Sequence, residues 1–361
     1  MPETAATAIE FAGVTKRYES AVAVEDLDLA IPAGLITTFV GPSGCGKTTS
    51  LRMINRMVEA TEGTILIQGE DNRDRPAHEL RRSMGYVMQQ AGLMPHRTVA
   101  DNIATVPRLK GASRADGRAR ALELMDTVGL DRKLAKRYPA QLSGGQAQRV
   151  GVARALAADS PILLMDEPFS AVDPVVRTDL QNELVRLHEQ LERTIVFVTH
   201  DIDEAVALGH RIAVFGEGGR IAQFGTPEEI LRAPADDFVA SFVGRDRGLR
   251  RLTFASGQEL PMHPLEGGTA SGLERPWAPW ELLLDDAARP AGWRFGEREV
   301  TGGTLFTPGG SLREALDAVL SSPSGWGVAV DDAGRAAGLI ASDDVMAAAG
   351  RERRSRYGVG E

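Results

Sequence analysis

The sequence predicts an α/β fold in which helices cover both faces of a parallel sheet. A β-prone apolar run at residues 36–40 leads into a glycine-rich loop and then into apolar residues at helical spacing. A second apolar run, at residues 162–165, ends in two carboxylates and is typical of a strand buried on both faces. Strand and helix patterns alternate over residues 9–89 and 150–231. We therefore expect an α/β domain at residues 1–243 with a helical insert at about 91–145.

The loop Gly41–Thr48 has the spacing of a phosphate-binding loop: glycine, four residues, glycine, lysine and a hydroxyl residue. The glycines let backbone N–H groups turn toward anionic oxygens, and the helix start adds the positive end of its dipole. Lys47 is predicted to reach the β- and γ-phosphates of a nucleotide, and Thr48 to bind Mg²⁺. The alternative is a glycine-rich turn without a ligand. The predicted contacts are Gly41, Ser43, Gly44, Cys45, Gly46, Lys47, Thr48 and Thr49.

Two further strand ends carry polar side chains suited to phosphate chemistry. Asp166 and Glu167 close the apolar run, and Pro168 stops the strand at the carboxyl edge where open α/β sheets bind ligands. Asp166 is suited to hold Mg²⁺ through water, and Glu167 to polarise an attacking water. The alternative is a solvated strand end. The β-prone run at residues 194–199 ends in His200, and a lone histidine at this place is more often structural.

The run Leu142–Gln146 contains a second glycine-pair helix start. Ser143 and the Gly144 and Gly145 amides precede a predicted helix over Gln146–Ala157 and so face outward as anion donors. One phosphate loop covers only one side of a γ-phosphate, and a loose transition state needs donors on every side. The sequence therefore offers two phosphate-facing elements.

This order of elements resembles the ATPase subunit of ATP-binding cassette (ABC) transporters, from residue 9 to about residue 243. The resemblance implies a P-loop NTPase sheet with an antiparallel β subdomain and a helical subdomain. It also implies a dimer in which Ser143, Gly144, Gly145 and Gln146 close on the ATP of the second copy. Ala147, where the family usually has a longer polar residue, is a small departure.

The resemblance also assigns roles to residues whose chemistry alone is ambiguous. It implies that His200 contacts the γ-phosphate, and that Gln89 senses Mg²⁺ and the attacking water. Residues 170–173, which end in Asp173, are similar to the loop that crosses between protomers. Tyr18 is similar to the aromatic residue that stacks on adenine, with an ordinary packed tyrosine as the alternative.

Composition restricts the partners of the chain. The net charge of −9 argues against a nucleic-acid-binding machine that relies on phosphate neutralisation. No apolar run approaches the roughly 20 residues that span a bilayer, and the sequence does not start with a signal peptide. The single cysteine, Cys45, suits a reducing compartment. We expect a peripheral subunit at the cytoplasmic face of the plasma (inner) membrane that works with separate transmembrane permease subunits.

The C-terminal part contains an internal repeat. After a predicted linker at 244–270, residues 282–293 match residues 328–339, each with a strand, a turn and a second strand. A capping box at Ser311 starts a predicted helix over Leu312–Leu320, and Asp343–Ala349 is expected to form another. Residues 271–349 resemble paired cystathionine-synthase-type (CBS-like) modules of a small α+β regulatory domain, the first degenerate. Two duplicated hairpins without a regulatory role are the alternative.

The ligand pattern of that module family is incomplete here. Ala341 stands where a ribose-binding hydroxyl belongs, although Asp344 fits, and the first copy has Phe295 and Arg298 at the two positions. We therefore expect a structural or ionic-strength role for these modules. The basic tail at 350–361 is either solvated or attracted to anionic lipid.

Softer motifs narrow the expected cargo. Residues 53–57 and 89–103 are similar to ATPases of glycine betaine, choline, carnitine or proline importers. The sequence thus predicts an ATPase that drives osmoprotectant uptake, with a second copy, the permease and an extracellular or periplasmic binding protein as partners. The alternatives are another small cargo (polyamine, sugar or amino acid), an ATPase that acts on DNA or ribosomes, and an inactive nucleotide-sensing cassette. The presence of Lys47, Glu167 and His200 opposes the last.

Overall fold

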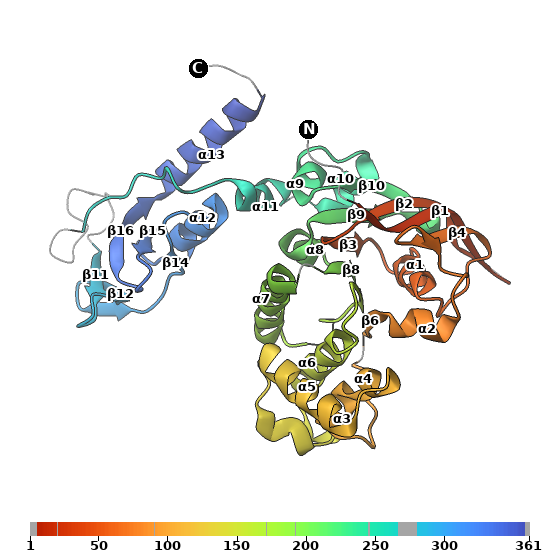
Figure 1. Ribbon diagram of the computed structural model, residues 1–361. Coiled ribbons are helices and arrows are strands. Elements are labelled where there is room, and N and C mark those ends of the chain that lie inside the picture. The colour runs from red at the N-terminus through yellow and green to blue at the C-terminus, as the bar shows by residue number, and fades with distance from the viewer. Residues whose placement is uncertain are drawn as a thin grey trace. The chain divides into compact units, whose positions relative to one another are not determined.

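The computed structural model describes residues 6–19, 21–89, 91–170, 172–191, 193–244, 246–265 and 280–357. Its residues divide into two compact units, Met1–Val243 and Gly244–Glu361. Each unit has its own sheets (Figure 1) and its own clusters of buried apolar side chains. Among the described residues, no helix is both long and apolar enough to cross a bilayer.

A six-stranded sheet of mainly parallel strands is the centre of the first unit. Its order is β10-β9-β3-β8-β7-β6, and only β10 pairs antiparallel with its neighbour. The strands are β3 (Ile36–Val40), β6 (Met84–Val87), β7 (Ile162–Asp166), β8 (Thr194–Val198), β9 (Arg211–Phe215) and β10 (Ile221–Gly225). Leu163 and Met165 pack into one core and Leu164 into a second, because successive side chains of a strand point to opposite faces. Burial of both faces explains the continuous apolar run, and the predicted α/β class is confirmed.

A four-stranded antiparallel sheet, in the order β2-β1-β4-β5, accompanies the central sheet. Its strands are β1 (Thr7–Tyr18), β2 (Ala21–Pro32), β4 (Glu62–Ile67) and β5 (Glu70–Asp71). Ile9 and Phe11 of β1 belong to the same core as Leu51 of the helix that follows the phosphate loop. This sheet therefore supports that helix.

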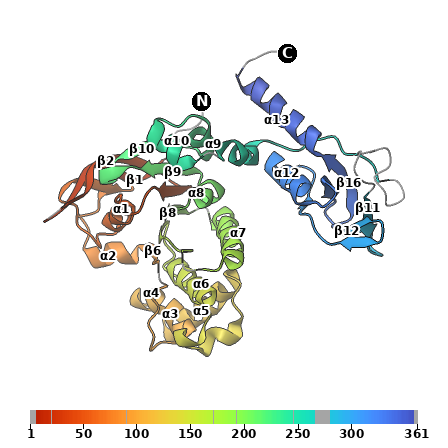
Figure 2. The same ribbon diagram turned by 180° about the vertical axis from the view of Figure 1, so that it is seen from behind.

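Four helices of the first unit form a group of their own. The helices α3, α4, α5 and α6 lie together, away from β1, β2 and β4, in both views of the molecule (Figures 1 and 2). The helices are α1 (Lys47–Ile54), α2 (Ala77–Arg82), α3 (Val99–Ile103), α4 (Thr105–Leu109), α5 (Arg114–Thr127), α6 (Gly144–Leu156), α7 (Pro174–Leu191), α8 (Ile202–Leu208), α9 (Pro227–Arg232) and α10 (Asp237–Val243), with 3₁₀ turns at Arg132–Lys136, Pro139–Gln141 and Glu217–Gly219.

The helix α6 differs from its predicted span, Gln146–Ala157. It begins two residues earlier, at Gly144, because Ser143 caps it. The Ser143 hydroxyl accepts from the Gln146 N–H (3.3 Å), and the Gln146 side chain accepts from the Ser143 N–H (3.1 Å), which is a capping box. Val150 of α6 shares a core with α3 and α5, so the helical part extends past residue 145.

The second unit contains two three-stranded sheets, β11-β12-β13 and β14-β15-β16. Its elements are α11 (Arg247–Arg251), a 3₁₀ turn (Leu252–Phe254), β11 (Glu281–Leu284), β12 (Pro290–Phe295), β13 (Arg298–Val300), β14 (Leu305–Phe306), α12 (Leu312–Ser321), β15 (Trp326–Val330), β16 (Ala336–Ala341) and α13 (Ser342–Tyr357). The predicted repeat forms two antiparallel hairpins, β11–β12 and β15–β16. Asp285 and Asp331 each accept from two backbone N–H groups of their own turn. The Ala336 N–H donates to the Ala288 carbonyl (2.9 Å), which joins the hairpins.

Two segments around this unit differ from the sequence-based boundaries. Residues 246–265, which fall within the predicted linker, pack on the second unit, where Ala255 and Leu260 enter the core. The Leu312 N–H donates to the Ala255 carbonyl (2.8 Å). Residues 350–357 of the predicted tail continue α13 as helix. Residues 266–279 and 358–361, on which parts of the predicted linker, modules and tail fall, lie outside the described residues.

Candidate functional site

The phosphate-binding loop joins β3 to α1 and depends on glycine at two close backbone contacts. Gly41 has φ 154°, and a Cβ there would lie 2.4 Å from the Phe215 carbonyl oxygen. Gly46, with φ 97°, caps α1 in the left-handed region, and its Cβ would lie 2.5 Å from the Ala23 carbonyl oxygen. Side chains at either position would push the loop away from the sheet. The sequence thus dictates a tight loop whose N–H groups precede a helix start.

Lys47 fills the interior of this loop. Its side chain is buried, and its ammonium donates to the carbonyls of Gly41 (2.8 Å) and Pro42 (2.7 Å). The Cys45 thiol is 3.6 Å from the same ammonium and is itself packed in the core. A bound phosphate would exchange these carbonyls for anionic oxygens, which give stronger, charge-assisted hydrogen bonds.

Asp166, at the carboxyl end of β7, accepts three side-chain hydrogen bonds. Its side chain is almost entirely buried, and the Thr48 hydroxyl donates to Oδ1 (2.7 Å). The Arg52 guanidinium (3.1 Å) and the Tyr86 hydroxyl (3.2 Å) both donate to Oδ2. Burial and the charge of Asp166 raise the pKa of Tyr86 to about 12. Tyr86 therefore remains a neutral hydrogen-bond donor at physiological pH.

Glu167, Gln89 and His200 meet at the same edge of the sheet. They follow the neighbouring strands β7, β6 and β8, whose carboxyl ends lie side by side. The Gln89 amide donates to Glu167 Oε2 (3.2 Å), and His200 Nδ1 lies 3.2 Å from the same oxygen. Glu167 has φ 43°, in the left-handed region, and its N–H donates to the Val198 carbonyl (3.1 Å). A strained backbone persists only where the surrounding structure holds it in place. Such residues cluster at functional sites.

A buried network supports the His200 end of β8. The Thr199 hydroxyl donates to Glu204 Oε2 (2.6 Å), and the Gln181 amide of α7 donates to Glu204 Oε1 (3.1 Å). Burial raises the pKa of Glu204, although these two donors oppose the shift. The network fixes the turn from β8 into α8.

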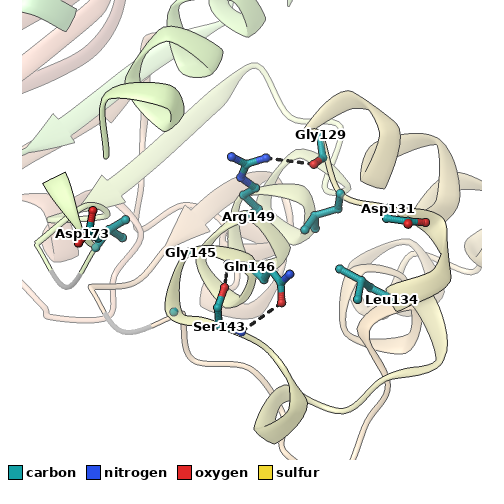
Figure 3. A pocket seen from close by; sticks show the side chains of 11 residues that line it. Gly129, Asp131, Leu134, Ser143, Gly145, Gln146, Arg149 and Asp173 are labelled. Carbon is teal, nitrogen blue, oxygen red and sulfur yellow. Dashed lines mark hydrogen bonds between the residues drawn. The ribbon is translucent and has the colours of Figure 1, made fainter. Parts of the chain in front are cut away.

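The second predicted phosphate-facing element lines a separate pocket of about 580 Å³ (Figure 3). The Arg149 guanidinium donates to the Gly129 carbonyl (3.0 Å), and Asp173 lies across the pocket from Asp131 and Leu134 (Figure 3). The lining residues are Gly129, Leu130, Asp131, Leu134, Ser143, Gly144, Gly145, Gln146, Arg149, Val172 and Asp173. Among the described residues, the lining of this pocket includes none from the 41–48 loop. The predicted contacts therefore lie in two separate groups within one chain.

Two predicted residues, Tyr18 and Thr49, lie outside both groups of contacts. Tyr18 ends β1 with its ring half exposed, and the Lys16 ammonium lies 4.9 Å from the ring centroid. Thr49 is half-buried in α1. Asp173 is exposed and faces the second pocket, whereas Ala171 of the same predicted loop lies outside the described residues.

Sequence reasoning missed Arg52, Tyr86 and Arg149. Arg52 follows Thr48 by four residues in a helix, and this spacing places both on one face, so the pattern could have indicated it. Tyr86 depends on which strand lies beside β7, and Arg149 depends on the packing of α6 on the 129–134 segment. Neither of these is a local property of the sequence.

A loop of this form between a buried parallel strand and a helix defines a P-loop nucleotide-binding protein. The family model described as ABC transporter matches residues 24–170. The chain is 43% identical, over an alignment of 365 residues that covers 95% of both chains, to the osmoprotectant import ATP-binding protein OsmV of Salmonella typhimurium. It is 52% identical to the glycine betaine uptake system ATP-binding protein YehX of Escherichia coli, over 69% of this chain and 80% of that one. The chain belongs to the ABC transporter family of ATP-binding proteins.

Solved structures agree with this assignment. A dimeric post-hydrolysis state of the ATP-binding cassette MJ0796 bound to ADP and Pi is 35% identical, with a TM-score of 0.56. The similarity covers 61% of this chain and 98% of that chain. The chain is thus an ABC ATPase that binds ATP, and its second unit extends beyond the shared cassette.

Proposed function

We propose that this chain is the ATP-hydrolysing subunit of an ABC importer for quaternary-amine osmoprotectants such as glycine betaine, choline or carnitine. The observation that carries the proposal is the 43% identity to the osmoprotectant subunit over nearly the full length of both chains, second unit included. The choline transport ATP-binding protein OpuBA of Bacillus subtilis, at 50% identity over 65% of this chain, supports the same cargo class.

The residues of the 41–48 loop and of the neighbouring strand ends, the first of the two groups, bind and orient the triphosphate. The Gly41–Thr48 backbone and the Lys47 ammonium hold the phosphates. Tyr18, whose exposed ring lies outside that group, stacks on the base. Glu167 orients and polarises the attacking water, with Gln89 and His200 at 3.2 Å from its carboxylate to fix its direction. The left-handed backbone at Glu167 presents the side chain at the sheet edge.

The residues around Thr48 and Asp166 fit a magnesium ion. Hydroxyl and carboxylate oxygens are the ligands that Mg²⁺ prefers, and such sites use one or two carboxylates plus substrate phosphates. Thr48, Asp166 and Gln89 would hold the ion, which when bound neutralises charge on the phosphates.

The second group acts on the nucleotide held by another copy of the chain. The capped start of α6 presents the Ser143, Gly144 and Gly145 donors, yet their pocket has its own walls away from the phosphate loop. A dimer would supply the missing side of each γ-phosphate, with Asp173 near the crossing point. Loss of an oxyanion-type donor costs roughly 3 kcal/mol, or about a hundredfold in rate, so hydrolysis depends on dimer closure.

We further propose that two copies attach to transmembrane permease subunits at the cytoplasmic face of the membrane, and that an external binding protein delivers the cargo. The test is ATP hydrolysis by the assembled transporter in liposomes. Glycine betaine, choline or carnitine with the binding protein should stimulate turnover, whereas polyamines, sugars and ordinary amino acids should not. Stimulation by one of the latter alone would refute the cargo and retain the ATPase.

The second unit is proposed to contain paired CBS-like modules, of which the first is degenerate and the second spans β14 to α13. The order β14-α12-β15-β16-α13 is strand, helix, strand, strand, helix. His263 Nε2 lies 2.8 Å from Asp344 Oδ2, so the family's ribose-binding carboxylate already has a partner. This contact favours a structural or ionic-strength role over adenosine binding.

The arginines at the end of α13 are proposed to approach anionic lipid, at about 1 kcal/mol per basic residue. Removal of residues 351–361 should then weaken the salt response of reconstituted transport. An unchanged salt response would refute the lipid contact.

A further inference from the structure

Arg52 and Tyr86, which no predicted role covers, converge with Thr48 on the Asp166 carboxylate. Thr48 and Arg52 lie four residues apart in α1 and therefore point from one face of that helix. The hydroxyl reaches Oδ1 (2.7 Å) and the guanidinium reaches Oδ2 (3.1 Å). One helical face thus contacts both oxygens of the carboxylate.

Tyr86 approaches the same carboxylate from the adjacent strand. It pairs with Leu164 in the parallel register of β6 and β7, and Asp166 lies two residues further along β7. Residues two apart in a strand point to the same face, so Tyr86 and Asp166 share a side of the sheet. The Tyr86 hydroxyl donates to Oδ2 (3.2 Å).

These contacts leave the carboxylate a single orientation. A buried carboxylate must be paired and hydrogen-bonded to remain charged, and Asp166 is 2% exposed. Arg52 supplies the charge and Tyr86 the neutral hydrogen bond, both on Oδ2. Oδ1 is thereby held toward Thr48, whose hydroxyl is one of the oxygens that suit a magnesium ion.

We propose that Arg52 and Tyr86 are positioning residues that fix the rotamer of Asp166 and so set the affinity of the ATP site for its divalent cation. This inference rests on the proposed ATPase site. Partners behind a metal ligand typically change metal affinity by about tenfold to a hundredfold when they are removed. The weaker hydrogen bond of Tyr86 places it at or below the lower end of that range.

The test measures cation binding apart from turnover. The full-length chain carries Arg52→Gln, Arg52→Lys or Tyr86→Phe, and Mn²⁺ binding is followed by electron paramagnetic resonance with a non-hydrolysable ATP analogue. Nucleotide affinity is measured separately in EDTA. Arg118→Gln on α5 and Tyr138→Phe, both at exposed side chains, are the matched controls. Thermal unfolding identifies any variant that fails to fold.

We expect Arg52→Gln to weaken Mn²⁺ binding about tenfold and Tyr86→Phe about threefold, with intermediate weakening in Arg52→Lys and nucleotide affinity in EDTA within about twofold of wild type. Equal Mn²⁺ affinity in the folded Arg52 and Tyr86 variants, the controls and wild type would overturn the inference. Equal loss of nucleotide affinity with and without metal would overturn it as well, because the residues would then support the phosphate loop. If wild type itself binds no Mn²⁺ with nucleotide, the proposed site fails instead.

Discussion

Replacing Glu167 by glutamine separates binding from hydrolysis more sharply than other changes at this site. The amide keeps the size of the side chain, and its oxygen can still accept from the Gln89 amide at the present 3.2 Å. The negative charge that polarises water is lost. A positioned general base contributes about 10² to 10⁴ in rate, which is roughly 2.7–5.4 kcal/mol at about 1.36 kcal/mol per tenfold. We expect turnover to fall by that factor while ATP binding persists.

The assay combines phosphate release with size-exclusion chromatography in ATP and magnesium. The Glu167→Gln chain should elute as a dimer that ATP holds together, because both phosphate-facing groups remain intact. Glu123→Gln, which removes an exposed carboxylate that pairs with Arg120 on α5, is the control and should leave turnover unchanged. Turnover of the Glu167 variant within twofold of wild type would refute its assignment as the base.

Three further outcomes follow from described geometry. Gly46→Ala should lower ATP affinity more than Gly44→Ala, because both backbones are left-handed but only the Gly46 Cβ would clash, at 2.5 Å from a carbonyl oxygen; equal affinities in fluorescent-nucleotide titrations would contradict this. Ser143→Ala should lower the unfolding free energy by about 1 kcal/mol and slow turnover without weakening ATP binding, and unchanged turnover would count against the dimer contact. Burial and the neighbouring His188 lower the pKa of His210, so its contribution to stability is complete above about pH 6.5 and is lost as pH falls from there toward the folded pKa. His210→Gln should therefore lose less stability than wild type between pH 7.5 and 5.5 in denaturant titrations, and an equal loss would refute the assignment.

The parts of the fold that could be predicted from sequence are those with local causes. The Gly41–Thr48 loop was readable because glycine spacing and helix entry lie within a few residues. The meeting of Glu167 and His200 followed from a general property, since parallel strands end at one edge of a sheet. The strand order β8-β7-β6 and the residue beside Asp166 depend on tertiary pairing, so the contact of Tyr86 cannot be predicted from local sequence.

Boundaries failed for reasons that particular residues explain. Glycine is a poor helix former, so the pattern predicts a start at Gln146, whereas the capping box of Ser143 and Gln146 begins α6 at Gly144. Residues 246–265 have weak periodicity because their order comes from non-local contacts, such as the bridge between His263 and Leu339. Residues 350–357 are rich in arginine and have few apolar side chains, so the sequence pattern predicts only the shorter helix Asp343–Ala349.

The backbone bridge at His263 holds an imidazole against a carboxylate that a ligand could otherwise bind. His263 exchanges both backbone hydrogen bonds with Leu339 while its imidazole meets Asp344 at 2.8 Å. A hydroxyl-bearing molecule that bound Asp344 Oδ2 would have to displace that imidazole. Occupancy of Asp344 by such a molecule and the contact between His263 and Asp344 therefore exclude each other.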